Sequence, residues 1–265
     1  QDEFDGYNKV LFLKRLEYII SNIEKVMDLY LNGFPASAYL IFSDLIKDAE
    51  LESELLNYRS FSLDSGYNLY RTKKEYEPKN LKYKGKNNGF NSFVDKYELF
   101  HAPFQHRKSV PTNRFSIPGF PCLYVSDSLY TSWSEAISEN DSFHAICFSN
   151  HRPLYLADLS PINYVFSKKP NSTINLYNEK FKNSLVDYAI LYPLILACHS
   201  KIKYIPAYKD EVVKFKSEYI IPQLLMQWYR ENKVMVDGIR YLSCTAVDRF
   251  PNKTFNKFNY VIPVI

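Results

Sequence analysis

Five side chains of the sequence are of types that together could hold a phosphate-bearing substrate and cleave it. Arginine forks bind phosphate oxygens, a tyrosine face stacks on a flat ligand ring, and a carboxylate stabilises positive charge that develops during a reaction. The five are Arg71 in "YNLYR", Arg114, Tyr124 and Glu135 in "NRFSIPGFPCLYVSDSLYTSWSEA", and Ser243 in "GIRYLSC". Such a set would suit cleavage through a positively charged intermediate.

Each of these residues also has an ordinary structural explanation. Arg71 ends a strand-like run and Arg114 follows a polar linker, which are common positions for salt-bridge partners. Ser243 lies in a strand-like segment, where a backbone hydrogen bond would satisfy its hydroxyl. The order of the whole set is therefore more informative than any single member.

Glu135 lies on a short helix that the sequence predicts after the capping residues Ser126-Asp127-Ser128. An apolar stripe that we expect to face the core is formed by Leu129, Trp133, Ala136 and Ile137. The stripe puts Glu135 on the opposite side, towards solvent or a cleft. Ser132 and Glu135 also fit the spacing of a capping box, which would give this glutamate a structural role instead.

Several common catalytic signatures are absent from the sequence. It contains no GxGxxG, GxxxxGK[ST], HExxH or GxSxG motif. The four cysteines form no CxxC pair and the histidines have no metal-ligand spacing, so we expect reduced thiols and no metal. Phosphate-loop, zincin and α/β-hydrolase classes are excluded.

The first 60 residues are expected to form a helical hairpin. Apolar positions recur at helical spacing from Lys9 to Tyr30, Asn32-Gly33 provides a stop, and a second amphipathic helix follows Pro35-Ala36-Ser37. We place a boundary there, with residues 1–60 as a helical extension and 61–265 as the main domain.

Beyond Phe61 short apolar runs alternate with turn residues, a pattern typical of strands. Helices are expected at the Glu135 segment and over Ile221–Asn232, so the mixture predicts an α+β fold. The expected strands are Tyr67–Arg71, Cys122–Val125, Phe143–Phe148, Leu154–Leu159, Ile239–Cys244 and Tyr260–Val264.

Composition limits the partners of the protein. The chain of 265 residues has 33 basic and 29 acidic side chains, a balance that does not favour direct nucleic-acid binding. The longest apolar run, Tyr188–Cys198, contains a proline and is too short to span a membrane, so we expect it in a core and no membrane contact. A cytoplasmic location is the default expectation. The lysine-rich stretch 72–86 is expected to be a solvated connection or, alternatively, a flap over a site.

Taken in order, "YR", the long block and "DGIRYLS" resemble the RES domain family, which is named for its arginine, glutamate and serine. The family's block has an Arg-aromatic pair, a Pro/Gly turn, a strand ending in Leu-Tyr and a helix with Glu. These elements stand at Arg114-Phe115, Pro118-Gly119, Leu123-Tyr124 and Glu135. The resemblance covers about residues 61–265.

The resemblance implies a fold similar to ADP-ribosyltransferases and diphtheria-toxin-like domains, a mixed β core with surrounding helices. It implies NAD as substrate, with no other cofactor and no metal. Known members are toxins that deplete NAD by hydrolysis or phosphorolysis, acting as NAD glycohydrolase or NAD phosphorylase, and a helix-turn-helix antitoxin usually neutralises them.

The resemblance also implies roles for the five residues. Arg71 and Arg114 would hold the pyrophosphate, with Arg240 as a competing candidate for that task. Tyr124 would stack on the nicotinamide ring and Glu135 would be the catalytic acid. Ser243 would orient the glutamate or a ribose hydroxyl.

Two other functions remain open at this point. The same arginines and glutamate would serve an ADP-ribosyltransferase, with a protein or small-molecule acceptor in place of water or phosphate. A non-catalytic interaction module is the other alternative, in which the N-terminal hairpin recruits partners or a second copy of the chain. Without such a partner, we expect the hairpin to be buried against its own domain.

Overall fold

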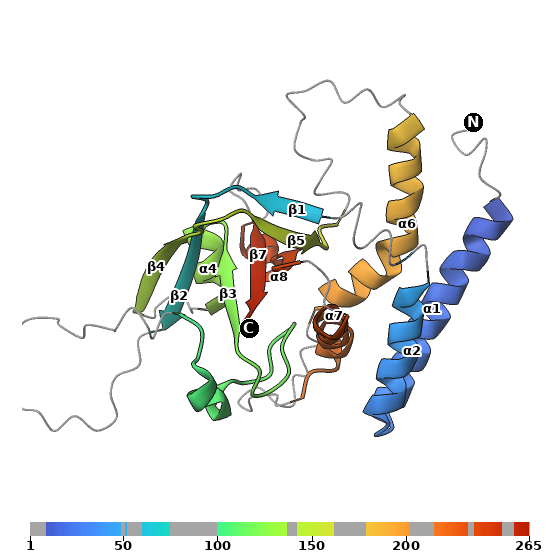
Figure 1. The fold of residues 1–265 in the computed structure, drawn as a ribbon, viewed down its shortest axis with the longest axis horizontal. Helices are drawn as coiled ribbons and strands as arrows, with labels where there is room; N and C mark the ends of the chain where they lie inside the picture. The colour runs from blue at the N-terminus through green and yellow to red at the C-terminus, as the bar shows by residue number, and fades with distance from the viewer. Residues whose placement is uncertain are drawn as a thin grey trace, which may run out of the picture.

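The computed structural model describes residues 9–48, 51, 60–74, 100–136, 142–161, 179–201, 215–232, 236–250 and 257–264. Within them a seven-stranded mixed sheet is combined with six α-helices, which confirms the α+β class. In Figure 1 the sheet, with the short helices α4 (Leu129–Ala136) and α8 (Cys244–Arg249), lies beside a group of longer helices.

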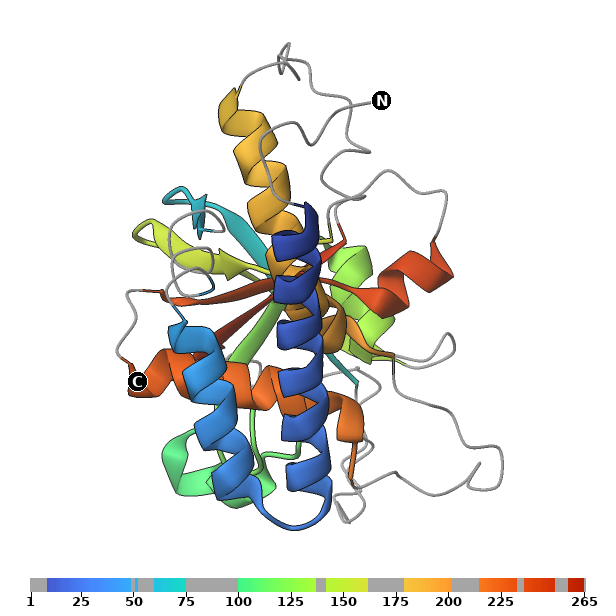
Figure 2. The same ribbon diagram turned by 90° about the vertical axis from the view of Figure 1, so that its right-hand side faces the viewer.

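The N-terminal hairpin is confirmed as α1 (Lys9–Leu31) and α2 (Pro35–Lys47). The turn between them uses Gly33 at φ +88°, a conformation that glycine adopts without a steric penalty, and Pro35 opens α2 where a missing N–H costs nothing. Figure 2 shows the two helices side by side, against α6 (Glu179–His199) and α7 (Ile220–Glu231).

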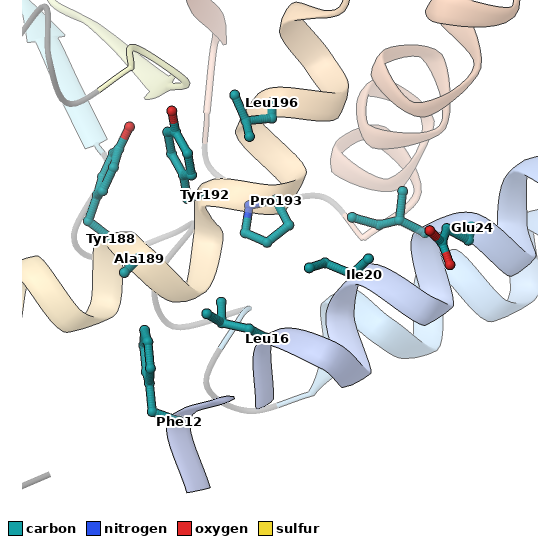
Figure 3. A pocket seen from close by; sticks show the side chains of 10 residues that line it. Phe12, Leu16, Ile20, Glu24, Tyr188, Ala189, Tyr192, Pro193 and Leu196 are labelled. Atoms are coloured by element: carbon teal, nitrogen blue, oxygen red, sulfur yellow. The ribbon is translucent and has the colours of Figure 1, made fainter. Parts of the chain in front are cut away.

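Between α1 and α6 an apolar groove of about 660 Å³ remains open (Figure 3). Phe12, Leu16 and Ile20 of α1 face Tyr192 and Pro193 of α6 across it. Glu24 is the single charged side chain among the described residues that line it. The described lining of the groove is therefore mainly apolar, which does not favour a catalytic role for it.

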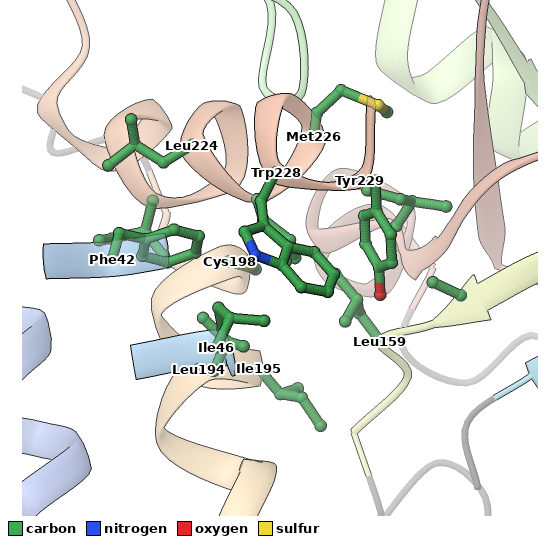
Figure 4. Packing of buried hydrophobic residues seen from close by; sticks show 14 of the residues in the cluster. Phe42, Ile46, Leu159, Leu194, Ile195, Cys198, Leu224, Met226, Trp228 and Tyr229 are labelled. Carbon is green, nitrogen blue, oxygen red and sulfur yellow. The ribbon is translucent and has the colours of Figure 1, made fainter. Parts of the chain in front are cut away.

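The hairpin shares one hydrophobic core with α6 and α7. Figure 4 shows the fully buried Trp228 of α7 directed towards Phe42 and Ile46 of α2 and Leu194 and Ile195 of α6. This burial is the outcome expected for an amphipathic hairpin within its own chain. The hydrophobic core is continuous across residue 60. The domain boundary placed there stays a prediction.

Helix α6 contains the apolar run that the sequence analysis placed in a core without assigning a helix. Pro193 lies inside it, and the side chains of Leu191, Leu194 and Cys198 are buried. At its end the His199 Nδ1 donates to the Ile195 carbonyl at 2.8 Å, and Nε2 accepts from the Leu242 N–H at 3.2 Å. His199 thereby ties the end of α6 to the sheet.

The sheet has the order β1-β5-β6-β7-β3-β2-β4, with β5 and β6 parallel and all other neighbours antiparallel. Six strands lie where the sequence predicts them, with ends shifted by a few residues. The four-residue β1 was not predicted, because it lies at the expected domain boundary. The strands are β1 (Ser60–Leu63), β2 (Asn68–Lys74), β3 (Cys122–Ser126), β4 (Phe143–Ser149), β5 (Leu154–Asp158), β6 (Gly238–Leu242) and β7 (Phe258–Pro263).

Alternation along β3 assigns its side chains to two faces. Leu123 and Val125 belong to a small core on one face, whereas Cys122 and Tyr124 contact the large core that includes α6 and α7. Ser126 follows the second set. The face with Tyr124 and Ser126 is the one that carries the candidate site.

Helix α4 begins where the sequence predicts, with Ser128 Oγ accepting from the Thr131 N–H at 3.0 Å. The predicted inward stripe is wrong at Leu129 and Ala136, which are exposed, whereas Trp133 is half-buried and Ile137 lies outside the described residues. The buried residues of the helix are Thr131, Ser132 and Ser134. Small hydroxyl side chains let the helix approach β2, where Thr72 Oγ1 donates to the Ser132 carbonyl at 2.9 Å. The capping-box interpretation is also wrong, because Ser132 lies within the helix.

Candidate functional site

A cavity of about 1080 Å³ opens over the sheet between β2, β3, α4 and α8. Arg71, Arg114, Tyr124 and Glu135 all line it, although Arg71 and Glu135 are far apart in the sequence. The fifth predicted residue, Ser243, is fully buried and lies behind Glu135. The structure thus brings the five residues to one place, while their roles stay predictions.

Three neutral donors hold the Glu135 carboxylate. Oε1 accepts from Ser243 Oγ at 2.5 Å and from Asn259 Nδ2 at 2.8 Å, and Oε2 accepts from Thr245 Oγ1 at 3.2 Å. Within the described part of the chain no lysine or arginine forms an ion pair with it. Glu135 is therefore fixed in position while its negative charge stays available to a cation.

Ser243 performs two tasks at once. The sequence predicts a strand through Cys244, but β6 ends at Leu242 and Ser243 is the N-cap of α8, its Oγ accepting from the Ala246 N–H at 2.9 Å. An accepting hydroxyl still has its proton to donate, and that proton goes to Glu135. Of the two roles considered for Ser243, this geometry favours orienting the glutamate.

The two arginines on the cavity wall are each partly occupied by backbone carbonyls. Arg71 donates to the Phe100 carbonyl at 2.8 Å, and burial lowers the pKa of its guanidinium. Arg114 Nη1 donates to the carbonyls of Cys198 and Ser200 at the end of α6, at 3.0 and 2.9 Å. A guanidinium has five N–H groups, so each retains donors for a ligand.

Two cations lie close to the ring of Tyr219 at another part of the wall. The Arg114 guanidinium carbon is 5.1 Å and the Lys216 ammonium 4.9 Å from the centre of its ring. Burial lowers the pKa of Lys216, and the nearby Arg114 lowers it further. Positive charge is thus concentrated here, and a bound anion would relieve the repulsion.

The sequence analysis did not identify most of the cavity's cations as site residues. Among the described residues, seven cationic side chains line the cavity against two carboxylates, Glu135 and Asp248, and Asp248 is already paired with Lys201 at 2.8 Å. Lys73 and Lys74 belong to the lysine-rich stretch 72–86, for which a flap over a site was one expectation, but no signal in the sequence separates Lys201 and Lys216 from ordinary surface lysines. The cations are Arg71, Lys73, Lys74, Arg114, Lys201, Lys216 and Arg249.

Tyr124 is held at its hydroxyl end. Its Oη accepts from the Phe115 N–H at 3.2 Å and is 3.0 Å from Ser116 Oγ, and burial raises its pKa. These contacts tie β3 to a tight turn closed by the Asn113–Ser116 bridge. The predicted Pro118-Gly119 turn follows, with Gly119 at φ +78° and Phe120 N–H donating to the Ile117 carbonyl.

Arg240, the competing candidate for phosphate binding, lies elsewhere. It forms an ion pair with Asp158 at 2.9 Å and packs its guanidinium over the rings of Phe61 and Phe258. It does not line the cavity. Its structural partners remove the reason for assigning it to the pyrophosphate.

Neither a metal-binding cluster nor a membrane-spanning helix is found within the described residues. Within these residues no three His, Cys, Asp or Glu side chains come together as a metal site would need. The expectation that the reaction uses no metal stays a prediction. Among the helices seen in the described segments, none has the length and apolar character needed to cross a membrane.

Comparison with known proteins gives one similarity. The chain is 29% identical over 258 residues to a protein of Bacillus subtilis (strain 168) that carries the name "Putative toxin YopC". The match covers 95% of this chain and 54% of the relative, so the chain spans about half of that protein's length. No family model and no solved structure matches the chain.

Proposed function

We propose that the protein cleaves the nicotinamide–ribose bond of NAD, with water or phosphate as the attacking nucleophile. The observation that carries the proposal is Glu135, held by three neutral donors and with no cationic partner among the described residues, on the wall of a strongly cationic cavity. A carboxylate in this state can stabilise a positive centre at once, without first breaking an ion pair.

The cavity suits a dinucleotide by charge and by size. Its excess of cations matches a pyrophosphate, to which the forks of Arg71 and Arg114 can donate in pairs. Its volume of about 1080 Å³ slightly exceeds the usual range of ligand sites, which ends at about 1000 Å³, and so leaves room for a ligand as large as a dinucleotide. Tyr124 and Tyr219 supply aromatic faces for stacking on flat rings.

The proposed reaction is balanced without a metal or redox partner. The carbon–nitrogen bond breaks and its electron pair leaves with nicotinamide, which becomes neutral, so positive charge moves to the ribose ring. Glu135 stabilises that charge. Water then forms the new bond to give ADP-ribose and a released proton, or phosphate forms it to give ADP-ribose 1''-phosphate.

A toxin-like role agrees with this chemistry, because loss of NAD would stop cellular metabolism. The similarity to the protein that carries the name "Putative toxin YopC" supports it. We further propose that the protein acts in the cytoplasm, where NAD is supplied, and that a helix-turn-helix antitoxin restrains it. The RES domain family remains the family that its motifs resemble.

Transfer of ADP-ribose to an acceptor is a second candidate, favoured by one surface feature. The ring of Phe250 is 6.5 Å from Tyr130, which is 62% exposed, and 6.0 Å from Trp133. Arg249, which lines the cavity, packs over Trp133 at 5.3 Å. This aromatic cluster at the cavity could receive an acceptor.

Incubation of the purified protein with NAD, with and without phosphate, tests the proposal. Nicotinamide together with ADP-ribose or its 1''-phosphate would support it and identify the nucleophile. ADP-ribose found on the protein or on an added acceptor would support transfer instead. NAD that stays intact in both buffers would contradict the proposal.

A further inference from the structure

We infer that Asn259 is a positioning residue that fixes Glu135 in its reactive orientation, and that Ser126 fixes Asn259 in turn. The inference rests on the proposed function of Glu135. Asn259 is on β7 and is 5% exposed, and it was not among the residues that the sequence analysis singled out.

Strand register places the three residues that build this arrangement. Asn259 is directly opposite Ser126 of β3 and Tyr241 of β6 in the two antiparallel ladders. Residues directly opposite one another project from the same face of a sheet, so all three point to the cavity face that Glu135 approaches from α4. The sheet therefore supplies a rigid base for the glutamate.

The orientation of the Asn259 amide is determined from both ends. Ser126 Oγ donates to Asn259 Oδ1 at 2.6 Å, and Asn259 Nδ2 donates to Glu135 Oε1 at 2.8 Å. A reversed amide would place Oδ1 against the carboxylate, two acceptors with no proton between them. Ser126, 3% exposed, thus keeps the donor end towards Glu135.

The three donors divide the two carboxylate oxygens unequally. Oε1 receives the two short hydrogen bonds, from Ser243 and Asn259, whereas Oε2 receives only the longer one from the Thr245 hydroxyl. Oε2 is therefore the oxygen left for the substrate. Without Asn259 the carboxylate could rotate, and Oε2 would no longer be the oxygen that faces the substrate.

Asn259→Asp is the sharpest test, because it keeps the shape and replaces the donor by a second carboxylate beside Oε1. The neighbouring titratable groups Tyr219, Tyr241 and Cys244 all have a pKa raised mainly by burial, so they stay neutral while the carboxylates titrate. Like charges in contact oppose ionisation. We expect the Glu135 carboxyl carbon signal to titrate at least one pH unit higher than in the parent protein, and the acid limb of nicotinamide release to move with it.

Ser126→Ala is the second variant, with Ser134→Ala as its control. Ser134 is an equally buried serine whose hydroxyl donates to the Thr131 carbonyl at 2.8 Å and not to Glu135 or Asn259. Ser126→Ala should lower kcat about fivefold with KM little changed, and should move the Glu135 signal in the same direction. Ser134→Ala should do neither.

The carboxyl titration is measured without NAD, so it separates this inference from the proposed function. If the Glu135 titration shifts in both variants but the parent protein does not cleave NAD, Asn259 still positions Glu135, and only the proposed reaction is overturned. If a folded Asn259→Asp protein, or Ser126→Ala where the first does not fold, shows the parent titration, the inference is overturned even though NAD is cleaved.

Discussion

Ser243 gives the most informative perturbation, because its hydroxyl both caps α8 and donates to Glu135, and two substitutions separate these tasks. Ser243→Ala removes the acceptor for the Ala246 N–H and the donor to Glu135 together. Loss of an N-cap costs about 1 kcal/mol with alanine but only a few tenths with glycine. The φ of −72° at Ser243 suits either residue, so neither adds backbone strain.

The magnitudes follow from these contacts. The lost cap should lower the Tm of Ser243→Ala by about 3 °C, and that of Ser243→Gly by about 1 °C. A hydrogen bond to a charged group contributes about 1.5–3 kcal/mol, so both variants should lose about 10- to 100-fold in kcat. KM should change little, because Ser243 does not line the cavity.

Thermal melts and initial rates of nicotinamide release, measured well below both Tm values, provide the test. The account requires that stability differs between the two variants and that kcat falls equally in both. If kcat followed stability, with Ser243→Gly close to the parent protein, Ser243 would be only a helix cap. That result would refute the donation to Glu135 as a functional contact.

Three further predictions concern the cavity and the sheet. Arg114→Lys keeps the positive charge but loses the guanidinium fork that can donate two hydrogen bonds to a phosphate, so we expect KM for NAD to rise about tenfold with kcat little changed. An unchanged KM would show that Arg114 does not bind the substrate. Binding of ADP-ribose should raise the pKa of Lys216, because a bound anion opposes the effects of burial and of Arg114. NMR of the Lys216 side chain measures this pKa, and a value that stays the same or falls would place the phosphates elsewhere. Gly238→Ala should lower the free energy of unfolding in urea by more than about 1 kcal/mol, since the added Cβ would lie 2.3 Å from the Val261 carbonyl oxygen. An unchanged urea midpoint would show that β6 and β7 can separate at no cost.

The spacing of apolar residues predicted the helices and strands that bury their apolar side chains in a regular pattern. The α1–α2 hairpin and α7 have clear apolar stripes, and six strands have short apolar runs between turn residues. It failed where packing used other residues. Helix α4 buries small hydroxyl side chains instead of its apolar ones, and α6 combines a continuous apolar run with an internal proline.

The candidate site was predictable in part. The order of Arg114, Tyr124 and Glu135 within one block indicated a shared site, and these residues do line one cavity. The partners of Glu135 were not predictable beyond Ser243, because Asn259 reaches it only through strand register, which a single sequence does not specify. Lys216 likewise becomes a site residue only through its place beside Tyr219.

Glu135→Gln is the measurement that tests the central claim most directly, with Glu24→Gln in the α1–α6 groove as a control that leaves the cavity intact. Binding of NAD by calorimetry and release of nicotinamide by chromatography should be recorded on the same samples. The account predicts that Glu135→Gln binds NAD about as well as the parent protein but releases nicotinamide at least about 100-fold more slowly, while Glu24→Gln behaves as the parent. Equal release by Glu135→Gln and the parent would contradict the assignment of Glu135 as the catalytic carboxylate.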